Sequence, residues 1–296
     1  MSAKNIASFG TVNAPIIRIK NFKIKEKAMK LKNIKMFAAA IVASTVGIGT
    51  ASADILDTIK ERGKLIVGVK ADYKPYGFLD TSGAIIGIEP DLASDVAAKL
   101  GVEVEFVPVV SSNRMQFLEQ GKIDLMIATM TDKPDRREVV LIPDPNYYSS
   151  GTNILSLKSL GLASWEDLRG KPVCGIQGAF YNKATSQNYG AEIVAFKGTA
   201  EAYSALKAGN CAAFVYDDSA IVAKVADPEW ADYEMPLPTI DDAPWGLAVQ
   251  LGEDAFGALM TDMIIDWHKT GRILELETKW GVTNTPFAKA MNEKYK

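Results

Sequence analysis

The sequence has very few of the residues on which catalytic and metal sites depend. Among 296 residues there is one histidine and there are two cysteines. A single histidine cannot build a site of several histidines around zinc, and His268 has no second histidine, cysteine or serine motif as a partner, so we expect it at the surface or at a helix end. The sequence also lacks the G-x-S-x-G, H-E-x-x-H and G-x-x-x-x-G-K-[ST] motifs. We therefore expect no cofactor and no metal, and these absences favour binding over catalysis.

Apolar runs long enough to span a membrane are also missing. A spanning helix needs about 18 apolar residues or more, and the apolar run over residues 36–49 is shorter. This run follows a basic segment that begins at Met29, and it precedes Ala51, Ser52 and Ala53. A basic segment, a short apolar run and an A-x-A site are typical of a secretory signal peptide. We expect translation to start at Met29 and the leader, residues 1–53, to be cleaved after Ala53.

Basic residues are scarce once the leader is set aside. Residues 1–53 hold nine of the 33 basic residues and one of the 36 acidic residues, so the remainder carries 24 basic and 35 acidic residues, a net charge of about −11. An acidic, exported chain is a poor candidate for binding nucleic acid or an anionic membrane surface. In an oxidising compartment the two cysteines, Cys174 and Cys211, would form either a disulfide or two separate buried thiols.

From residue 54 onward, segments typical of strands alternate with segments typical of helices. Apolar or period-two runs predict strands, and apolar residues three and four apart predict helices. Strands separated by helices in this rhythm form βαβ units with a largely parallel sheet. The pattern restarts near residue 152, which indicates an α/β fold with two lobes and a cleft between them. The expected strands are 65–69, 102–106, 124–129, 152–157, 171–177, 192–196, 212–216 and 245–250, and the expected helices include 90–100, 165–168, 199–208 and 256–267.

Residues 124–137 combine a buried strand, a hydroxyl-rich turn and a short helix that begins near Pro134. Such a turn presents free backbone N–H groups, Thr129 and Thr131 add hydroxyls, and Arg136 adds a planar set of donors. Together these groups suit one small carboxylate. The alternative is an ordinary strand-to-helix turn with a surface arginine.

Five motifs stand out after residue 54: GKLIVGVKADYKPYGF (63–78), GIEPDLA (87–93), GKID (121–124), PDRR (134–137) and DPNYY (144–148). In order and spacing they resemble periplasmic solute-binding proteins of polar amino-acid ABC transporters (family 3 extracellular solute-binding proteins). Each motif is weak alone, but the resemblance runs from about residue 54 to the C-terminus. It implies the type II periplasmic-binding-protein fold, in which each lobe is a mostly parallel sheet flanked by helices and two crossover segments join the lobes. Lobe 1 would comprise residues 54–148 and 246–296, and lobe 2 would comprise residues 149–245.

The resemblance also implies which residues hold the ligand. Arg136 matches the arginine that binds the ligand α-carboxylate in that family, and Thr129 and Thr131 match the hydroxyl and backbone donors of the same turn. Ala128 would supply a backbone acceptor. On the second lobe, Asp217 looks like the carboxylate that receives the α-ammonium group. Opposite charges on opposite lobes would make the ligand the bridge that closes the cleft.

Three further residues are expected around the ligand. Tyr73 matches an aromatic residue that packs over it, although Tyr73 could instead pack its own loop. Asp217 likewise has an alternative role as a cap of the helix that follows it. Lys70 and Arg114 match positions that meet the ligand side chain in relatives that bind acidic amino acids, which favours aspartate or glutamate. Lys70 could equally be solvated.

One segment departs from the family pattern. Relatives commonly have Gly-Thr-Thr here, with hydroxyls that help to hold the ligand side chain, whereas this chain has Gly178, Ala179 and Phe180. The departure counts against an acidic ligand and leaves room for Phe180 to stack on the ligand.

The expected function is that of a periplasmic binding protein without enzymatic activity. It would be a monomer that captures a polar L-amino acid and delivers it to an inner-membrane ABC permease, closing about the crossover segments 148–153 and 241–245. The alternative is an exported dehydratase of the same fold that acts on a cyclic amino-acid precursor. Glu89 and Asp218 are the only candidates for the acid or base that such an enzyme needs.

Overall fold

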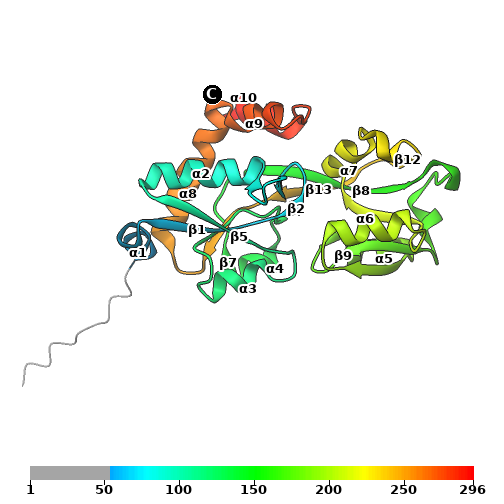
Figure 1. Cartoon of the computed structure of the whole chain (residues 1–296), viewed down its shortest axis with the longest axis horizontal. Helices are drawn as coiled ribbons and strands as arrows, with labels where there is room; N and C mark the ends of the chain where they lie inside the picture. Colours follow the sequence, from blue (N-terminus) through cyan, green and yellow to red (C-terminus); the bar gives the residue numbers. More distant parts are fainter. Residues whose placement is uncertain (1–53) are drawn as a thin grey trace, which may run out of the picture. The chain divides into compact units, whose positions relative to one another are not determined.

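The computed structural model describes residues 54–296. The expectations for the leader, with a start at Met29 and cleavage after Ala53, lie outside the described residues. Within residues 54–296, no helix is both long and apolar enough to cross a bilayer. This part of the chain folds around two main β-sheets that carry separate helices, which confirms the predicted two-lobed α/β fold (Figure 1).

The first sheet has five strands, in the order β5 (Glu103–Pro108), β1 (Lys64–Val69), β6 (Leu125–Met126), β14 (Ala248–Gln250) and β7 (Val140–Leu141). The first three are parallel, and β14 is antiparallel to both of its neighbours. The apolar run of β1 suits a strand covered on both faces, because α2 (Ile88–Leu100) and α3 (Arg114–Glu119) pack on opposite sides of it (Figure 1). Other elements of this region are α1 (Ile55–Arg62), α4 (Pro134–Arg137) and a small sheet of β2 (Asp72–Tyr73), β3 (Gly77–Leu79) and β4 (Ile85–Ile86).

Helix α2 begins two residues earlier than predicted. The N–H groups of Ile88 and Glu89 donate to the carbonyl oxygens of Pro75 and Tyr76 at 3.1 and 2.9 Å, so the preceding loop satisfies the first turn of the helix. The helix ends as predicted at Gly101, which adopts the left-handed conformation at φ +72°. The early start places Glu89 in the first turn of α2, where its buried side chain reaches the cleft region.

The second sheet has six strands. β10 (Glu192–Phe196), β9 (Pro172–Ile176) and β11 (Ala213–Asp217) are parallel, as the βαβ rhythm predicts. β8 (Tyr148–Leu157) is antiparallel to β11, and β12 (Tyr233–Glu234) and β13 (Ile240–Trp245) both pair with β8. The helices of this region are α5 (Tyr181–Tyr189), α6 (Thr199–Lys207), α7 (Asp218–Val225) and three short 3₁₀ helices, η1 (Lys158–Leu160), η2 (Trp165–Leu168) and η3 (Pro228–Trp230).

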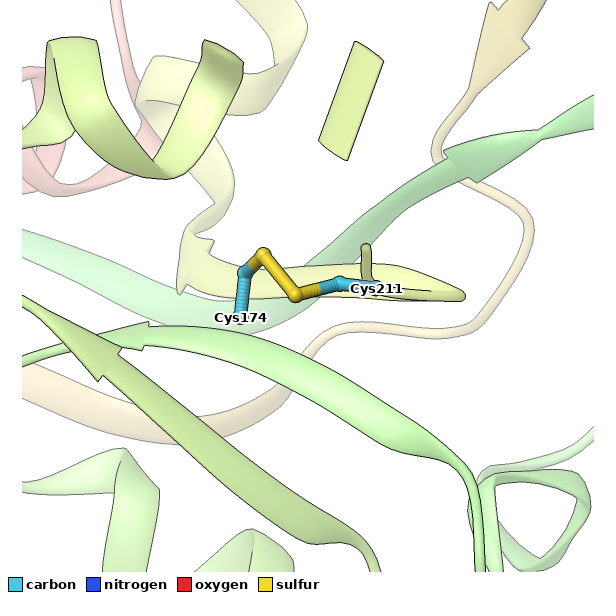
Figure 2. Close-up of a disulfide and its surroundings, with 2 residues drawn as sticks. All are labelled: Cys174 and Cys211. Carbon is cyan, nitrogen blue, oxygen red and sulfur yellow. A yellow bond between two sulfur atoms is a disulfide. The ribbon is translucent and has the colours of Figure 1, made fainter. Parts of the chain in front are cut away.

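A disulfide joins two neighbouring strands of the second sheet. Cys174 lies in β9 and Cys211 lies two residues before β11, and their sulfur atoms are bonded (Figure 2). The parallel pairing of Phe214 with Cys174 brings the two strands side by side. The bond closes a loop with a sequence separation of 37 that contains α5, β10 and α6. The alternative of two separate thiols therefore does not hold.

Two paired antiparallel strands, β8 and β13, carry the chain between the lobes (Figure 1). Tyr148 pairs with Trp245, and the register shifts between Ile240 and Ala243. The predicted strand 245–250 is wrong, because Trp245 belongs to β13 whereas β14 starts at Ala248. Gly246 lies between them, where an added Cβ would lie 2.3 Å from the side chain of Ile142. Only glycine lets the backbone approach the first lobe this closely.

The chain ends in three helices, α8 (Asp254–Thr270), α9 (Arg272–Lys279) and α10 (Pro286–Tyr295). The predicted apolar stripe of α8 is confirmed as core, since Phe256, Met260 and Trp267 are buried. His268 does lie in the last turn of α8, but the surface interpretation is wrong: it is 1% exposed. Its Nε2 lies 2.9 Å from the carbonyl oxygen of Asn146. The histidine is therefore a buried structural residue.

Candidate functional site

Arg136 lies in α4, whose first residue is Pro134. Its guanidinium is buried, with Nη1 donating to the carbonyl oxygen of Thr131 at 2.7 Å and Nη2 donating to that of Gly178 at 3.3 Å. Gly178 belongs to the second lobe, so Arg136 reaches across the cleft. Burial lowers the pKa of Arg136 below its ordinary value, and nearby carboxylates that include Asp217 offset only part of this decrease. Arginine nevertheless stays charged in proteins. The alternative of a surface arginine is wrong.

Glu89 stabilises the turn that precedes α4. Thr129 has a φ of +49°, a left-handed conformation that is uncommon for threonine. The carboxylate of Glu89 stabilises it, because Oε1 accepts the N–H of Thr129 at 2.6 Å and also accepts the hydroxyl of Tyr147. β6 ends at Met126, before this turn, so the strand predicted over residues 124–129 is too long. The N–H of Thr129 is thus engaged by Glu89.

Two further cations of the first lobe are buried near Arg136. Lys70 is 1% exposed and its Nζ lies 3.4 Å from Oδ1 of Asp72, without a hydrogen-bond partner among residues 54–296. The solvated alternative for Lys70 is wrong. Arg114 donates from Nη1 to the carbonyl oxygen of Ala128, while its Nε lacks a partner in the described chain. Burial lowers the pKa of Lys70, and burial together with the charge of Arg136 lowers the pKa of Arg114 to about 10.

Asp217 ends β11 and meets Tyr73 from the opposite lobe. The hydroxyl of Tyr73 donates to Oδ2 of Asp217 at 2.7 Å, and both side chains are buried. Asp217 is the N-cap residue of α7, but its side chain makes no capping hydrogen bond in the described structure, so the capping alternative is wrong. Burial raises the pKa of Asp217 to about 7. The Tyr73 ring also packs on Tyr216, with centroids 4.8 Å apart, so Tyr73 contacts the second lobe as well as its own loop.

Gly178 and Phe180 form part of the second-lobe edge of the cleft. Gly178 has a φ of +80°, and an added Cβ would lie 3.0 Å from the carbonyl group of Ser111 in the first lobe. Glycine therefore permits this close approach. Nζ of Lys133 lies 5.0 Å from the centroid of the Phe180 ring, a cation–π contact between the lobes. A cavity of about 710 Å³ opens beside Arg136, Gly178 and Phe180.

The charges of these side chains act on one another across the lobes, since Asp217 raises the pKa of Arg136 and both Arg114 and Lys70 lower that of Asp217. The first lobe contributes three buried cations, and the second lobe contributes one buried carboxylate. Each of the three cations comes from a loop or a short helix beside the first sheet, and Asp217 comes from the carboxyl end of a parallel strand. In open α/β sheets, ligands bind at such strand ends. The arrangement can hold a small molecule that carries both a negative and a positive group.

Comparison with known proteins gives this geometry a family. The sequence model of the bacterial extracellular solute-binding proteins, family 3, matches residues 65–283. The chain belongs to this family. The ABC transporter glutamine-binding protein GlnH of Bacillus subtilis (strain 168) is 31% identical to it over 272 residues, which cover 86% of this chain and 97% of that protein.

Two solved structures also resemble this family 3 solute-binding protein. The arginine-bound form of a truncated ArgBP from T. maritima has a TM-score of 0.67 and 31% identity, covering 71% of this chain and 99% of that one. The ancestral amino acid-binding protein AncCDT-1, described as a precursor of cyclohexadienyl dehydratase, has a TM-score of 0.68 and 32% identity, covering 76% of this chain and 99% of that one.

Several residues in the cleft of this solute-binding protein escaped sequence reasoning. Asp72 of the first lobe hydrogen-bonds Thr199 of the second, at a sequence separation of 127. Glycine before a helix indicates an N-terminus, as at Gly198, but no pattern in the sequence names a partner so far away. Glu89 was considered only as an acid or base, whereas it holds the turn at Thr129.

Proposed function

We propose that this chain captures a polar L-α-amino acid between its lobes and delivers it to an ABC importer. One observation supports this most: Arg136 on the first lobe and Asp217 on the second are both buried, and Asp217 favours the charged form of Arg136, so the two groups lie near each other between the lobes. An α-carboxylate needs a set of donors and an α-ammonium group needs a carboxylate. GlnH is named for glutamine and ArgBP was solved with arginine, so these relatives share the α-amino acid group and differ in the side chain.

For the ligand side chain we favour a carboxylate, as in glutamate or aspartate. Nζ of Lys70 and Nε of Arg114 are buried without hydrogen-bond partners among the described residues. A buried donor without a partner costs about 1–3 kcal/mol. A second ligand carboxylate would supply both partners at once. The absence of the Thr-Thr pair at residues 179–180 still counts against this choice, so the ligand panel below decides it.

The proposed cycle is hinge closure. Lobe 1, residues 54–148 and 246–296, and lobe 2, residues 149–245, would close about the segments 148–153 and 241–245. The register shift of β13 and the φ of +58° at Asp241 support a hinge there, because hinges are a few residues that absorb large changes in φ and ψ. We further propose that the protein acts as a periplasmic monomer, released by cleavage after Ala53, beside an inner-membrane permease.

A dehydratase acting on a cyclic amino-acid precursor is the second candidate. Burial raises the pKa of Glu89 to about 7, as an acid or base at neutral pH requires, and AncCDT-1 is similar in sequence. Glu89 already accepts hydrogen bonds from Thr129 and Tyr147, and Oδ1 of Asp218 accepts from the hydroxyl of Ser150 at 2.7 Å. These contacts suit positioning roles better than proton transfer. A turnover assay with prephenate and arogenate separates the candidates.

The proposed function is tested by a thermal-shift panel on residues 54–296 with the common L-amino acids and plain dicarboxylates. A ligand at 1,000 times its Kd stabilises the native state by about 4 kcal/mol, and each kcal/mol moves the midpoint by roughly 2–4 °C in a chain of this size. A shift with glutamate or aspartate alone supports Lys70 and Arg114 as side-chain contacts. A shift with neutral or basic amino acids keeps the binding function and discards the acidic ligand. No shift with any α-amino acid contradicts the proposal.

A further inference from the structure

The N-terminus of α6 receives its cap from the opposite lobe. The N-cap residue of this nine-residue helix is Gly198, which has no side chain that could accept a hydrogen bond from the first turn. The N–H of Thr199 instead donates to Oδ2 of Asp72 at 2.7 Å. A carboxylate at this position satisfies an otherwise unpaired N–H and interacts favourably with the helix dipole. Asp72 thus acts on α6 as an N-cap side chain would, although it lies in β2 of the first lobe.

The hydroxyl of Thr199 strengthens the same contact. Oγ1 of Thr199 donates to the backbone carbonyl oxygen of Asp72 and also lies 3.1 Å from its Oδ2. Thr199 therefore donates hydrogen bonds to Asp72 across the cleft from both its backbone N–H and its hydroxyl group. Thr199 is buried in this contact, whereas Asp72 is partly exposed. Opening the cleft would break these interactions together, since each joins one lobe to the other.

Gly198 is matched to this contact. Its φ of −135° is an ordinary extended conformation, so an alanine here would meet no backbone strain. A Cβ built on Gly198 would lie 2.7 Å from Oδ2 of Asp72, and the only described atoms within 4 Å, its own chain neighbours aside, belong to the Asp72 carboxyl group. A methyl group at residue 198 would therefore disturb the carboxylate of Asp72 and leave the rest of the second lobe as it is.

The same carboxylate touches the proposed ligand pocket. Oδ1 of Asp72 lies 3.4 Å from Nζ of Lys70, whose side chain is 1% exposed. One oxygen of Asp72 thus faces α6 and the other faces a cation in the cleft. Asp72 is placed to favour the closed arrangement of the lobes without contacting the α-carboxylate or α-ammonium sites at Arg136 and Asp217.

We propose that Asp72 is an inter-lobe latch, a positioning residue that caps α6 only in the closed protein and so sets how long a bound ligand is retained. The latch rests on the proposed function for its ligand but not for its closure. Because the cap contacts only protein atoms, it strengthens the retention of ligands with uncharged side chains by a similar factor, whereas a charged ligand side chain beside Lys70 also senses the carboxylate of Asp72. Selection among ligands belongs to the side chains that line the pocket.

The test measures Kd and the dissociation rate for each ligand found in the panel, in wild type, Asp72→Ala, Asp72→Asn and Gly198→Ala. Loss of a helix cap should raise Kd and the dissociation rate by about 2- to 30-fold in Asp72→Ala, by the same factor for all ligands whose side chains are uncharged. Asp72→Asn should lose less, because its amide oxygen still accepts the N–H of Thr199. Gly198→Ala should resemble Asp72→Ala although it leaves Asp72 in the sequence.

Asp227→Ala is the matched control, since Asp227 caps η3 by accepting the N–H of Glu229 within one lobe. It should lower the melting temperature and leave the dissociation rate unchanged. If Asp72→Ala behaves like this control, or if its effect differs among ligands with uncharged side chains, the latch is wrong. An unchanged dissociation rate in Gly198→Ala would also overturn it.

A measurement on ligand-free protein separates failure of the latch from failure of the proposed function. Fluorophores on Lys99→Cys and Glu192→Cys, two exposed positions in different lobes, report the lobe separation while the native cysteines stay bonded. If no amino acid binds wild type, the proposed function fails. Larger separations between the ligand-free lobes in Asp72→Ala than in wild type would still support the latch. Equal distance distributions in wild type and Asp72→Ala would refute it.

Discussion

The two walls of the cleft differ in charge and in construction. The wall on the first lobe is cationic, with Lys70, Arg114 and Arg136 on loops and short helices. The wall on the second lobe pairs a single carboxylate, Asp217, with the aromatic ring of Tyr216. Neither wall alone complements a zwitterion. In the proposed function, binding and closure are therefore one event, because the two charged groups of a zwitterionic ligand would find their partners only when both walls meet.

The walls also differ in how they are held. Glu89 supports the first wall through hydrogen bonds to Thr129 and Tyr147. The second wall is held covalently, since the disulfide between Cys174 and Cys211 joins β9 to the segment that leads into β11, the strand that ends at Asp217. Polar support on one side depends on pH, whereas covalent support on the other depends on redox conditions. The following predictions separate the walls by these properties.

The largest effect is expected from Arg136→Ala on the first wall. Removing one partner of a buried charge pair costs about 2–5 kcal/mol, so Kd should rise by at least about 30-fold while the fold is kept. The measurement is isothermal titration with the ligand found in the panel. Arg137→Ala is the control from the same helix, because Arg137 pairs with Asp132 and Asp144 and does not itself line the cavity beside Arg136. Equal affinity of Arg136→Ala and wild type would refute the proposed carboxylate site.

The next largest effect belongs to the second wall. Removing the disulfide with the double substitution Cys174→Ser and Cys211→Ser should lower the free energy of unfolding by about 3–4 kcal/mol, as expected for a loop of this length. The loss should fall on lobe 2, since both residues lie there. Hydrogen exchange should show faster exchange in β9 to β11 than in β1 and β5. Uniformly faster exchange in both sheets would show that the lobes unfold as one unit.

Asp217→Asn should weaken binding by less than Arg136→Ala. The amide keeps an oxygen that can accept the hydroxyl of Tyr73, but it loses the charge that attracts an ammonium group. A hydrogen bond to a charged group contributes about 1.5–3 kcal/mol, so Kd should rise by about 10- to 100-fold. An α-hydroxy acid analogue of the ligand, which has no ammonium group, should bind both forms alike. A similar loss of affinity for the amino acid and for its α-hydroxy acid analogue in Asp217→Asn would argue against Asp217 as the ammonium partner.

The smallest effect is the pH dependence that Glu89 imposes on the first wall. Burial raises the pKa of Glu89 from 4.5 to about 7, so the folded protein binds more protons than the unfolded chain between these values. The free energy of unfolding should therefore fall as pH rises through this window, by at most about 1.4 kcal/mol per pH unit. Glu89→Gln keeps an oxygen for Thr129 and Tyr147 and should flatten this slope in denaturant titrations between pH 5 and 7. If the slope is as steep in Glu89→Gln as in wild type, the pH dependence comes from other groups, and Asp217 is the first to test because its pKa is also raised to about 7.

Elements whose pattern is complete within a short segment could be predicted from the sequence. The strand expected over 192–196 is β10, and the helix expected over 199–208 is α6, one residue shorter. Elements that depend on a distant partner could not. Trp245 is apolar like the residues after it, yet it pairs with Tyr148 and ends β13. His268 has a polar side chain, yet packing against α10 and the segment at Asn146 buries it.

The sequence by itself determined the βαβ order, the apolar stripe of α8 and the family motifs, one of which contains Arg136, because each depends on spacing between neighbours in the chain. Only the tertiary structure decided that Lys70 is buried, that Asp217 meets Tyr73 instead of capping α7, and that Asp72 caps a helix 127 positions away. The physical reason is the same in all three cases. Burial and hydrogen-bond partners are properties of the space where segments meet, and local spacing carries no information about which distant segment will fill that space.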